Sequence, residues 1–313
     1  MGEWSKSVGE KGEKILSFLL KEIVGHNTII ENEPFDCIRG QKHKRKEAKG
    51  ERKTHGIDGL VSYESPLEDN ILETVLVSSK FTSKKYPTSP KATFKEHIND
   101  LAYSIECYRN SKSFAELKQN YSNISRTDIT GVLVWTSNKN ALDYKLLPEI
   151  SNSILDQDLN FDRIIVIDND RINFLYDTIY FCKQIYGNEK IDFIYHNTSL
   201  NNISLQSKSY GKILPIQYLF SDVIPIRIQK SSEEVEIIIF CKDSFNQDNF
   251  SKILSFAKTF DHLNSVNRVT IAFNDFDDLE NKKIVLSQLI KFPNYKYEQN
   301  LFVKKYPTDF RNR

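Results

Sequence analysis

The sequence predicts an α/β protein in which a mixed sheet is flanked by helices and followed by a smaller C-terminal α/β domain. Two observations lead to this prediction. Short apolar runs, typical of buried strands, alternate along the chain with segments whose apolar residues recur at helical spacing. The 313 residues, 39% of them hydrophobic, are enough for one large domain or two modest ones with real cores.

The N-terminal part begins with a helix over about residues 5–24. Its apolar face has helical spacing and carries Val8, Ile15, Leu16, Leu19 and Ile23. A short strand is expected near residues 28–37. Strands near 56–63 and 72–81 are expected to form a hairpin through the turn-rich sequence ESPLEDN.

A second helix begins at Ser89 and Pro90, which suit an N-cap and a first helical position. Its apolar positions follow the spacing i, i+4, i+7, i+11 and are Phe94, Ile98, Leu101 and Ile105. Four further elements, a strand, a strand, a helix and a strand, are expected at residues 131–135, 161–168, 171–186 and 191–196.

The polar sequence NNISLQSKSYGK, from Asn201, has the composition of a linker. The segments beyond it follow the order strand, helix, strand, helix, which is typical of a small α/β domain. We therefore expect one domain over residues 1–200 and a second over 201–313.

Composition limits the possible functions. The formal net charge is +1, so any nucleic-acid binding must depend on local basic clusters. No apolar run approaches the roughly 20 residues that span a bilayer, and the polar N-terminus does not resemble a signal peptide. We expect a cytoplasmic protein that makes no membrane contact.

The four cysteines lie far apart without a CxxC pair, which favours buried thiols in a reducing compartment. A zinc site of Cys37, His43 and His26 is the alternative. Its spacing fits no standard zinc motif, so no zinc site is expected.

Three charged residues suggest metal-dependent phosphodiester chemistry, which needs carboxylates to hold Mg²⁺ and a lysine close to the attacking water. Glu13 lies at the edge of the first helix's apolar face, between Gly9 and Gly12 on one side and Leu16 on the other. We expect the two glycines to let this helix approach another backbone closely. The alternative for Glu13 is a glutamate placed there by the helix dipole.

Asp58 interrupts a strand between Gly56 and Gly59, where an acid is disfavoured unless it is exposed or used. Lys80 ends the apolar run VLVSSK, and strand alternation places Ser78 on the same face. The alternatives are a turn aspartate and a lysine whose ammonium group reaches solvent at a strand end.

Taken in order, these residues resemble the PD-(D/E)xK, or restriction-endonuclease-like, nuclease superfamily, whose core order is α-β-β-β-α-β. The matching residues are Glu13 in GEKGEK, Asp58 in HGIDGL and Lys80 in VSSKF, within residues 1–137. The resemblance implies that Glu13 and Asp58 bind Mg²⁺ or Mn²⁺ together with the carbonyl of Ser79. It also implies that Lys80 is the active-site lysine.

Ser78 departs from this pattern, which has Asp or Glu at that position. A hydroxyl is a weaker ligand, but two carboxylates and a substrate phosphate suffice to hold Mg²⁺. Three alternatives remain open: a loosely held metal, an acid supplied by Glu33 or Asp36, or a degenerate site that binds nucleic acid without cutting it.

A closer resemblance links MGEWSKSVGEKGEKI, THGIDGL and the residues after VSSKF to the nuclease subunit of GAPS-type two-gene anti-phage pairs from Gamma-Mobile-Trio islands. It extends more weakly through DRIIVIDNDRI and GKILPIQYL. This resemblance implies a partner subunit encoded nearby, a hetero-oligomer and a role in abortive infection, with DNA or an RNA such as tRNA as substrate. The C-terminal domain has no catalytic motif, so we expect it to be a partner or assembly surface.

Basic residues close to Asp58 and Lys80 are expected to contact nucleic-acid phosphates, although a solvated loop without a ligand is the alternative. They are Lys42, Lys44, Arg45, Lys46, Lys49, Arg52 and Lys53 in one loop, with Lys84 and Lys85 after Lys80. His55 is expected to support Asp58. The sequence leaves three hypotheses: a metal-dependent nuclease, a non-catalytic nucleic-acid sensor working through a partner, and an adaptor acting only through protein contacts.

Overall fold

The computed structural model describes residues 2–45, 48–140, 144–196, 209–258, 266–291 and 300–306. The chain forms two compact units, and among the described residues the first ends at Ile172 and the second begins at Asn173. The expected boundary lay near residue 200. The division falls earlier because β7 (Ile191–Ile194), expected as the last strand of the first domain, hydrogen-bonds with the sheet of the second unit.

The first unit is built on a mixed sheet with the strand order β3-β4-β5-β6. β4 (Ile71–Thr82), β5 (Arg126–Ser137) and β6 (Arg163–Ile167) are parallel, and β3 (Gly59–Glu64) is antiparallel to β4. β4 and β5 are buried over most of their length, as expected for strands covered on both faces. The predicted mixed sheet and the β3–β4 hairpin are confirmed.

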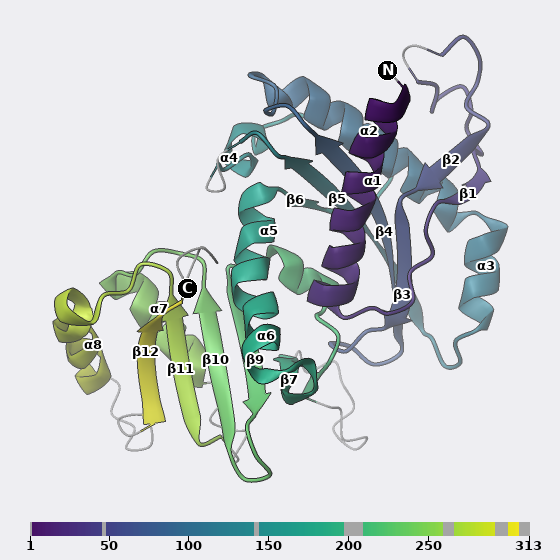
Figure 1. Ribbon diagram of the computed structural model, residues 1–313. Helices are drawn as coiled ribbons and strands as arrows, with labels where there is room; N and C mark the ends of the chain where they lie inside the picture. Colours follow the sequence, from purple (N-terminus) through teal and green to yellow (C-terminus); the bar gives the residue numbers. More distant parts are fainter. Residues whose placement is uncertain are drawn as a thin grey trace. The chain divides into compact units, whose positions relative to one another are not determined.

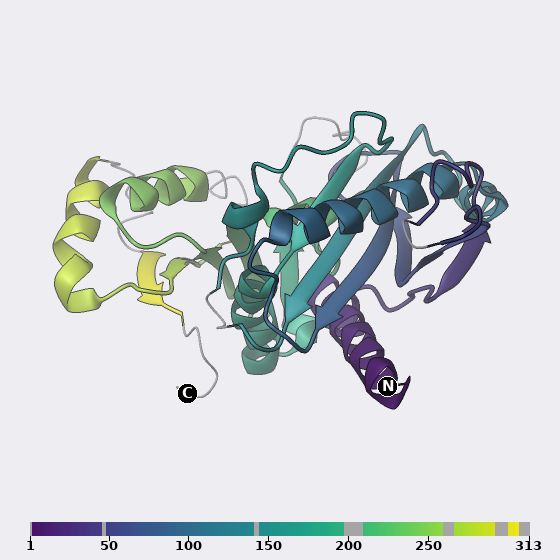
Figure 2. The same cartoon turned by 90° about the horizontal axis from the view of Figure 1, so that it is seen from above.

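Helices cover both faces of this sheet, with α1 (Gly2–Phe18) on one side and α2 (Pro90–Arg109) on the other (Figures 1 and 2). α1 continues into the π-helical segment η1 (Leu19–Val24) and ends at Gly25, whose φ of 87° favours glycine. The side chains buried from α1 and η1 are Leu16, Leu19, Leu20, Ile23 and Val24. The side chain of Val8 lies outside the described residues.

α2 supplies the core on the other face of the sheet. Its predicted apolar positions are all buried, and they pack in one cluster with Leu76, Leu133 and Trp135 of the strands. Ser89 occupies the expected N-cap position, but its side chain makes no capping hydrogen bond. α3 (Lys112–Gln119) was not predicted; the hydroxyl of its N-cap, Ser111, accepts a hydrogen bond from Phe114 N at 3.1 Å.

A small antiparallel pair, β1 (Glu33–Asp36) and β2 (Thr54–Ile57), lies beside α2 in the first unit. β1 is shorter than the predicted strand near 28–37. β2 and β3 together form the predicted strand near 56–63, which is interrupted at Asp58. The first unit also contains α4 (Leu147–Ile150), and α5 (Asn169–Leu175) begins in it.

The second unit has its own sheet, with the strand order β12-β11-β10-β9-β7-β8. Three of these strands, β8, β9 and β12, were not predicted, and β8 lies in the segment expected to be a linker. The strands besides β7 are β8 (Tyr210–Gly211), β9 (Val223–Gln229), β10 (Val235–Cys241), β11 (Arg268–Phe273) and β12 (Leu301–Lys305). The helical segments are η2 (Tyr176–Tyr180), α6 (Phe181–Tyr186), η3 (Asn188–Lys190), η5 (Ile216–Phe220), α7 (Gln247–Ala257) and α8 (Asp278–Lys291).

The core of the second unit explains the predicted strand-helix-strand-helix order. β10 and β11 are parallel, and α7 connects them. Phe250 and Leu254 of α7 are fully buried in a cluster with Ile239 and Ile271 of the sheet. None of the helices in the described part of the chain has the length and apolar character that a bilayer crossing requires.

Candidate active site

A cavity of about 560 Å³ in the first unit brings together residues far apart in the sequence. Glu13 of α1, Asp58 between β2 and β3, and Lys80 of β4 all line it. Ser79, Lys84 and Lys85 line it as well. Most residues predicted for the catalytic site therefore surround one space.

Asp58 is fixed by the backbone of β4. Its amide N–H donates to the Val77 carbonyl at 3.1 Å, and its Oδ2 accepts from the Ser79 amide at 2.6 Å. This short, charge-assisted hydrogen bond holds the carboxylate at the edge of β4. The interruption between β2 and β3 thus places an acid at the cavity wall.

Glu13 reaches the cavity because α1 lies very close to β4 at Gly12. The Ser79 hydroxyl donates to the Gly12 carbonyl at 3.2 Å. A Cβ added at Gly12 would lie 3.1 Å from Ser79 Oγ and 3.3 Å from Phe81 Cβ. The expected role of glycine in close approach is confirmed for Gly12 and is wrong for Gly9, where nothing lies within 4 Å. Glu13 itself is exposed on the cavity side.

Lys80 forms part of an ion-pair network that the sequence analysis did not identify. Its ammonium group lies 3.8 Å from Asp100 Oδ2 of α2, and Arg52 Nη1 donates to Asp100 Oδ1 at 2.5 Å. Burial raises the pKa of Asp100, but the hydrogen bond and charge of Arg52 and the charge of Lys80 outweigh it and hold the pKa below its ordinary value. Asp100 is therefore an ionised carboxylate close to the proposed catalytic lysine.

Ser78 lines a second, smaller cavity of about 250 Å³ together with Asp58, Lys80 and Asp100. The predicted alternation is consistent with this placement, because Ser78 and Lys80 share it while Ser79 contacts Gly12 of α1. Ser78 is 8% exposed. Asp100 is thus the acid that the fold places near the serine.

The acids proposed to fill the place of Ser78 lie elsewhere. Glu33 and Asp36 belong to β1, where they pair with Ile57 and Thr54 of β2. The Glu33 carboxylate accepts a hydrogen bond from Ser113 Oγ at 3.4 Å. Neither acid lines either cavity.

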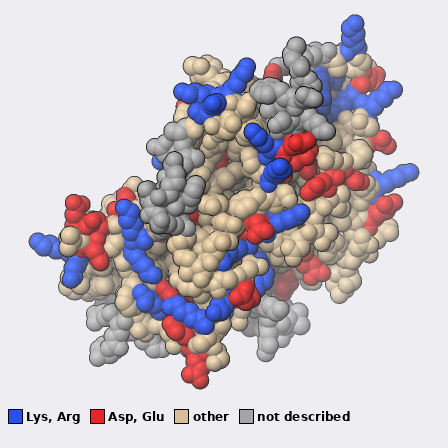
Figure 3. Space-filling view, in the orientation of Figure 1, with Lys and Arg blue, Asp and Glu red and all other residues tan. Residues whose placement is uncertain are grey.

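Some of the basic residues predicted to contact nucleic acid are exposed, and others form ion pairs within the protein. Lys44, Arg45, Lys49, Lys53, Lys84 and Lys85 are exposed. Figure 3 shows Lys and Arg side chains, interspersed with acidic ones, at the upper right, where β1, β2 and the segment between them lie in Figure 1. Lys46 lies outside the described residues.

The other two basic side chains of this segment are held in place. Lys42 lies 3.2 Å from Asp158 and 3.7 Å from Glu106, and the side chain of Arg52 is only 8% exposed beside Asp100. His43, in the middle of the segment, is 1% exposed. The expectation of a wholly solvated loop is wrong, because His43 is buried and Glu106 and Asp100 of α2 anchor the loop.

His55 does not occupy the position expected for it. Its described contacts are with Ser104, whose hydroxyl lies 3.3 Å from Nδ1, and with the rings of Phe35 and His43. These contacts direct the His55 ring toward α2. None of them is with Asp58, so the expected support of Asp58 stays a prediction.

A polar stripe on α2 carries further cavity residues that were not among the predicted catalytic or metal-binding residues. Its members recur at i, i+4, i+7, i+11 and i+14 and are Thr93, His97, Asp100, Ser104 and Cys107. Thr93 and His97 line the larger cavity, while Asp100 and Ser104 line the smaller one. This spacing beside the apolar face was the available signal, because polar residues on a buried helix side usually have a partner or a function.

His97 adds a neutral imidazole to the larger cavity. Burial lowers its pKa to about 4, and the charge of Lys80 acts in the same direction. Its ring lies edge-on to Trp135 with the centroids 5.0 Å apart. At neutral pH it can therefore form hydrogen bonds without adding charge.

Comparison with protein families agrees with this geometry. The model of the GAPS4 protein PD-(D/E)XK nuclease domain matches residues 1–171, more than half of the chain. The chain belongs to this family. No curated protein and no solved structure matches it. The resemblance drawn from GEKGEK, HGIDGL and VSSKF is confirmed at the family level.

The GAPS4 PD-(D/E)XK match spans every residue that lines the two cavities. The chain therefore carries a nuclease domain, and nucleases of this type generally use divalent metals. The donor set fits such a metal, because the carboxylates of Glu13 and Asp58 border one cavity and hard divalent cations prefer oxygen ligands.

Proposed function

We propose that this chain is the nuclease of an anti-phage defence pair and cleaves phosphodiester bonds with Mg²⁺ or Mn²⁺ as an abortive-infection effector. The observation that carries the proposal is the convergence of Glu13, Asp58 and Lys80 on one cavity. The family match supports the reaction class. The substrate is nucleic acid, either DNA or an RNA such as tRNA.

Each residue has a role that follows from its position. Asp58 and Glu13 hold the cation, with the Ser79 carbonyl as a further oxygen donor. The Ser79 N–H orients the Asp58 carboxylate, which reduces the reorganisation needed for binding. Lys80 orients the attacking water and stabilises negative charge on the phosphate. When bound, a divalent cation supplies Lewis-acid polarisation and a more acidic water.

The exposed basic residues bind the nucleic-acid backbone. Lys84 and Lys85 line the cavity itself, so they lie closest to the phosphate that is cut. Lys44, Arg45, Lys49 and Lys53 extend the positive surface along the segment before Asp58. Binding through such contacts weakens as salt concentration rises.

A non-catalytic sensor is the second candidate, and Ser78 is the observation that favours it. A serine in place of the second acid removes one negative charge from the site, while Arg52 and Lys80 both compete for the nearby Asp100. A site with only Glu13 and Asp58 could bind nucleic acid and deliver a partner enzyme without cutting.

The decisive experiment incubates the purified chain, alone and with the product of the neighbouring gene, with Mg²⁺ and a panel of duplex DNA, single strands and tRNA. We expect cleavage that a chelator abolishes. Asp58→Asn and Lys80→Ala should each lower the rate by at least about 100-fold, because the first removes a charged ligand of the cation and the second removes a positive charge beside the phosphate.

Asp36→Asn is the matched control, since Asp36 is an exposed acid on β1 outside both cavities. Undiminished cutting by both site variants would refute the nuclease proposal. No cutting by the wild type, with salt-sensitive binding that is lost on neutralising Lys44, Arg45, Lys49 and Lys53, would support the sensor instead.

We also propose that the second unit binds the partner subunit through α8. Leu279, Leu286 and Ile290 recur at i, i+7 and i+11 on this helix and are 94%, 52% and 76% exposed. Val285 and Leu289 of the same helix pack on the core. Large apolar side chains gathered on one exposed helix face are typical of a protein–protein contact.

A further inference from the structure

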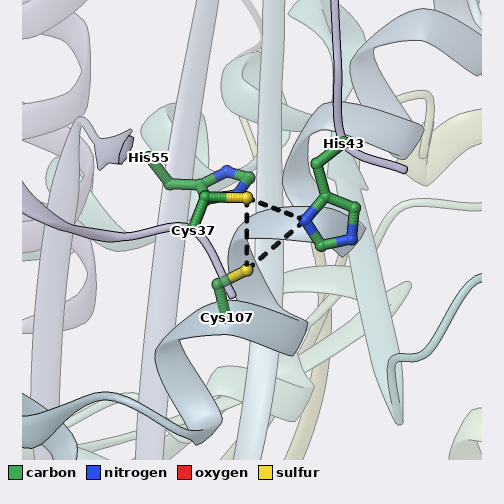
Figure 4. A group of neighbouring side chains, drawn as sticks. All are labelled: Cys37, His43, His55 and Cys107. Atoms are coloured by element: carbon green, nitrogen blue, oxygen red, sulfur yellow. Dashed lines mark hydrogen bonds between the residues drawn. The ribbon is translucent and has the colours of Figure 1, made fainter. Parts of the chain in front are cut away.

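Four potential metal ligands gather in the first unit, away from the proposed catalytic acids. Cys37 follows β1, His43 lies in the segment between β1 and β2, His55 belongs to β2 and Cys107 to α2. Figure 4 shows the four side chains pointing toward one another. One ligand atom from each lies within 4.8 Å of all the others.

The distances within this group match the edges of a tetrahedral site. Cys37 Sγ and Cys107 Sγ are 3.9 Å apart, and each lies 3.4 Å from His43 Nδ1. Zinc bonds of about 2.3 Å to sulfur and about 2.1 Å to nitrogen would separate two sulfurs by about 3.8 Å and a sulfur and a nitrogen by about 3.6 Å. The two sulfurs are not joined in a disulfide, and both cysteines are free thiols.

His55 leaves one nitrogen for a metal. Its Nδ1 lies 3.3 Å from the Ser104 hydroxyl, whereas its Nε2 is buried without a hydrogen-bond partner. An unpartnered buried polar atom is costly in a native structure. A metal ion in the centre of the group would satisfy it.

His43 is held in the tautomer that a metal ligand requires. Its Nε2 lies 3.1 Å from Glu106 Oε2, so this nitrogen carries the hydrogen and Nδ1 faces the two sulfurs with a free lone pair. Glu106 is 2% exposed and is paired with Arg39 at 3.1 Å. A carboxylate behind a ligating histidine is the usual outer partner in zinc proteins.

We propose that Cys37, His43, His55 and Cys107 bind a structural Zn²⁺ ion. Two thiolates and two imidazoles select zinc over Mg²⁺ and Ca²⁺, which prefer oxygen. His43, His55 and Cys107 are buried and the protein supplies four ligands, so the site is closed and has no position for a substrate. It is a separate site from the one proposed for Mg²⁺, and it does not rest on the proposed function.

The ion would join the parts of the chain that carry the site residues. Cys37 and His43 anchor the basic segment. His55 lies in β2, three positions before Asp58, and Cys107 lies two helical turns after Asp100 on α2. Zinc would therefore fix the basic segment and β2 against α2. Its loss is expected to loosen Arg52 and Asp58 together.

The test measures metal in the full chain, expressed in zinc-containing medium and purified without a metal-binding tag. Elemental analysis should find about one zinc ion per chain. Cys107→Ser and His55→Ala should lose most of it, whereas Cys182→Ser and His26→Ala, a buried thiol and a buried imidazole outside the group, should retain it. Asp58→Asn should also retain zinc, which separates this result from the outcome of the nuclease assay.

A second measurement does not depend on how the variants fold. Wild-type protein stripped of metal and titrated with Co²⁺ should develop the visible absorption of tetrahedral cobalt with thiolate charge transfer. Chelation should also lower the melting temperature of the wild type. The proposal is overturned if the purified chain contains no zinc and the stripped chain gives no tetrahedral cobalt spectrum, or if Cys37 and Cys107 are found as a disulfide.

Discussion

Ser78 and Asp100 define the unusual chemistry of this site. The serine occupies the position where the superfamily pattern has an acid, and Asp100 of α2 lines the same small cavity. Asp100 is engaged by Arg52 at 2.5 Å and lies 3.8 Å from Lys80, so its charge is already neutralised. The two carboxylates proposed to hold the metal, Glu13 and Asp58, must therefore do so without a third free acid.

Restoring the acid at residue 78 should strengthen metal binding. Ser78→Asp would place a carboxylate beside Asp58 and Lys80. We expect the Mg²⁺ concentration for half-maximal cleavage to fall by about tenfold, because an added charged ligand raises the affinity of an oxygen site. A titration of cleavage rate against Mg²⁺ measures this shift.

Ser78→Asn is the control for this substitution, since it has nearly the same shape as aspartate without the charge. It should leave the Mg²⁺ requirement at or above the wild-type level. An equal improvement in both variants, or none in Ser78→Asp, would show that residue 78 does not act through the metal.

At the scale of secondary-structure elements, the site depends on the contact between α1 and β4. Gly12 lets the helix backbone approach Ser79 and Phe81, and Glu13 follows it directly. Gly9, one turn earlier, has no atom within 4 Å of an added Cβ. The two glycines form a natural pair for testing the importance of this close approach.

Gly12→Ala should reduce cleavage by about tenfold, because the added methyl group lies 3.1 Å from Ser79 Oγ and 3.3 Å from Phe81 Cβ, and relieving these contacts disturbs the packing of α1 on β4 that positions Glu13. Gly9→Ala should leave cleavage unchanged and raise the free energy of unfolding by up to about 1 kcal/mol, since alanine favours a helix. Cleavage rates and urea denaturation of the two variants provide the measurement. Equal activity of both variants would contradict the proposed positioning of Glu13.

The single helix α2 contributes residues to both the proposed active site and the proposed zinc site. Its apolar face packs on the sheet, while its polar stripe reaches from His97 at the larger cavity to Cys107 among the zinc ligands. One helix therefore links the proposed active site to the anchored basic segment.

At the scale of the whole molecule, the chain separates a nuclease domain from a second α/β unit. The family match ends at residue 171, and the compact division falls at Ile172. The second unit has its own sheet and core, including β7, which the sequence analysis assigned to the first domain. Its proposed role in partner binding depends on the exposed face of α8.

Charges placed on this face should prevent assembly with the partner. Leu279→Glu with Ile290→Glu is expected to weaken binding of the neighbouring gene product by about 2 kcal/mol or more, as for other buried apolar contacts at interfaces. The measurement is calorimetry or co-purification of the two full-length proteins.

Ile185→Glu is the matched control, because Ile185 is an isoleucine of α6 in the same unit that is 53% exposed. It should bind the partner normally. The assignment of α8 fails if the double variant still binds with wild-type affinity, or if Ile185→Glu is the variant that loses binding.

Local sequence patterns were sufficient to predict much of the fold and part of the site. Helical spacing identified α1 and α2, and apolar runs identified β4, β5 and β10, because these signals arise from residues near one another in sequence. The motifs around Glu13, Asp58 and Lys80 led to the family, which the comparison confirms. Strand membership was less predictable, as β7 shows, since pairing depends on distant segments.

The sequence by itself thus determined the longer helices, the main strands and the nuclease family, because periodicity and short motifs are local properties. Only the tertiary structure decided which distant polar residues meet. It placed Asp100 beside Lys80, and it joined Cys37 and His43 to His55 and Cys107 in place of His26, whose ring packs on Tyr63. The first group joins α2 to β4, and the second joins α2 to β2 and to the segment after β1. Neither could be predicted from spacing along the chain, because its members are distant in sequence.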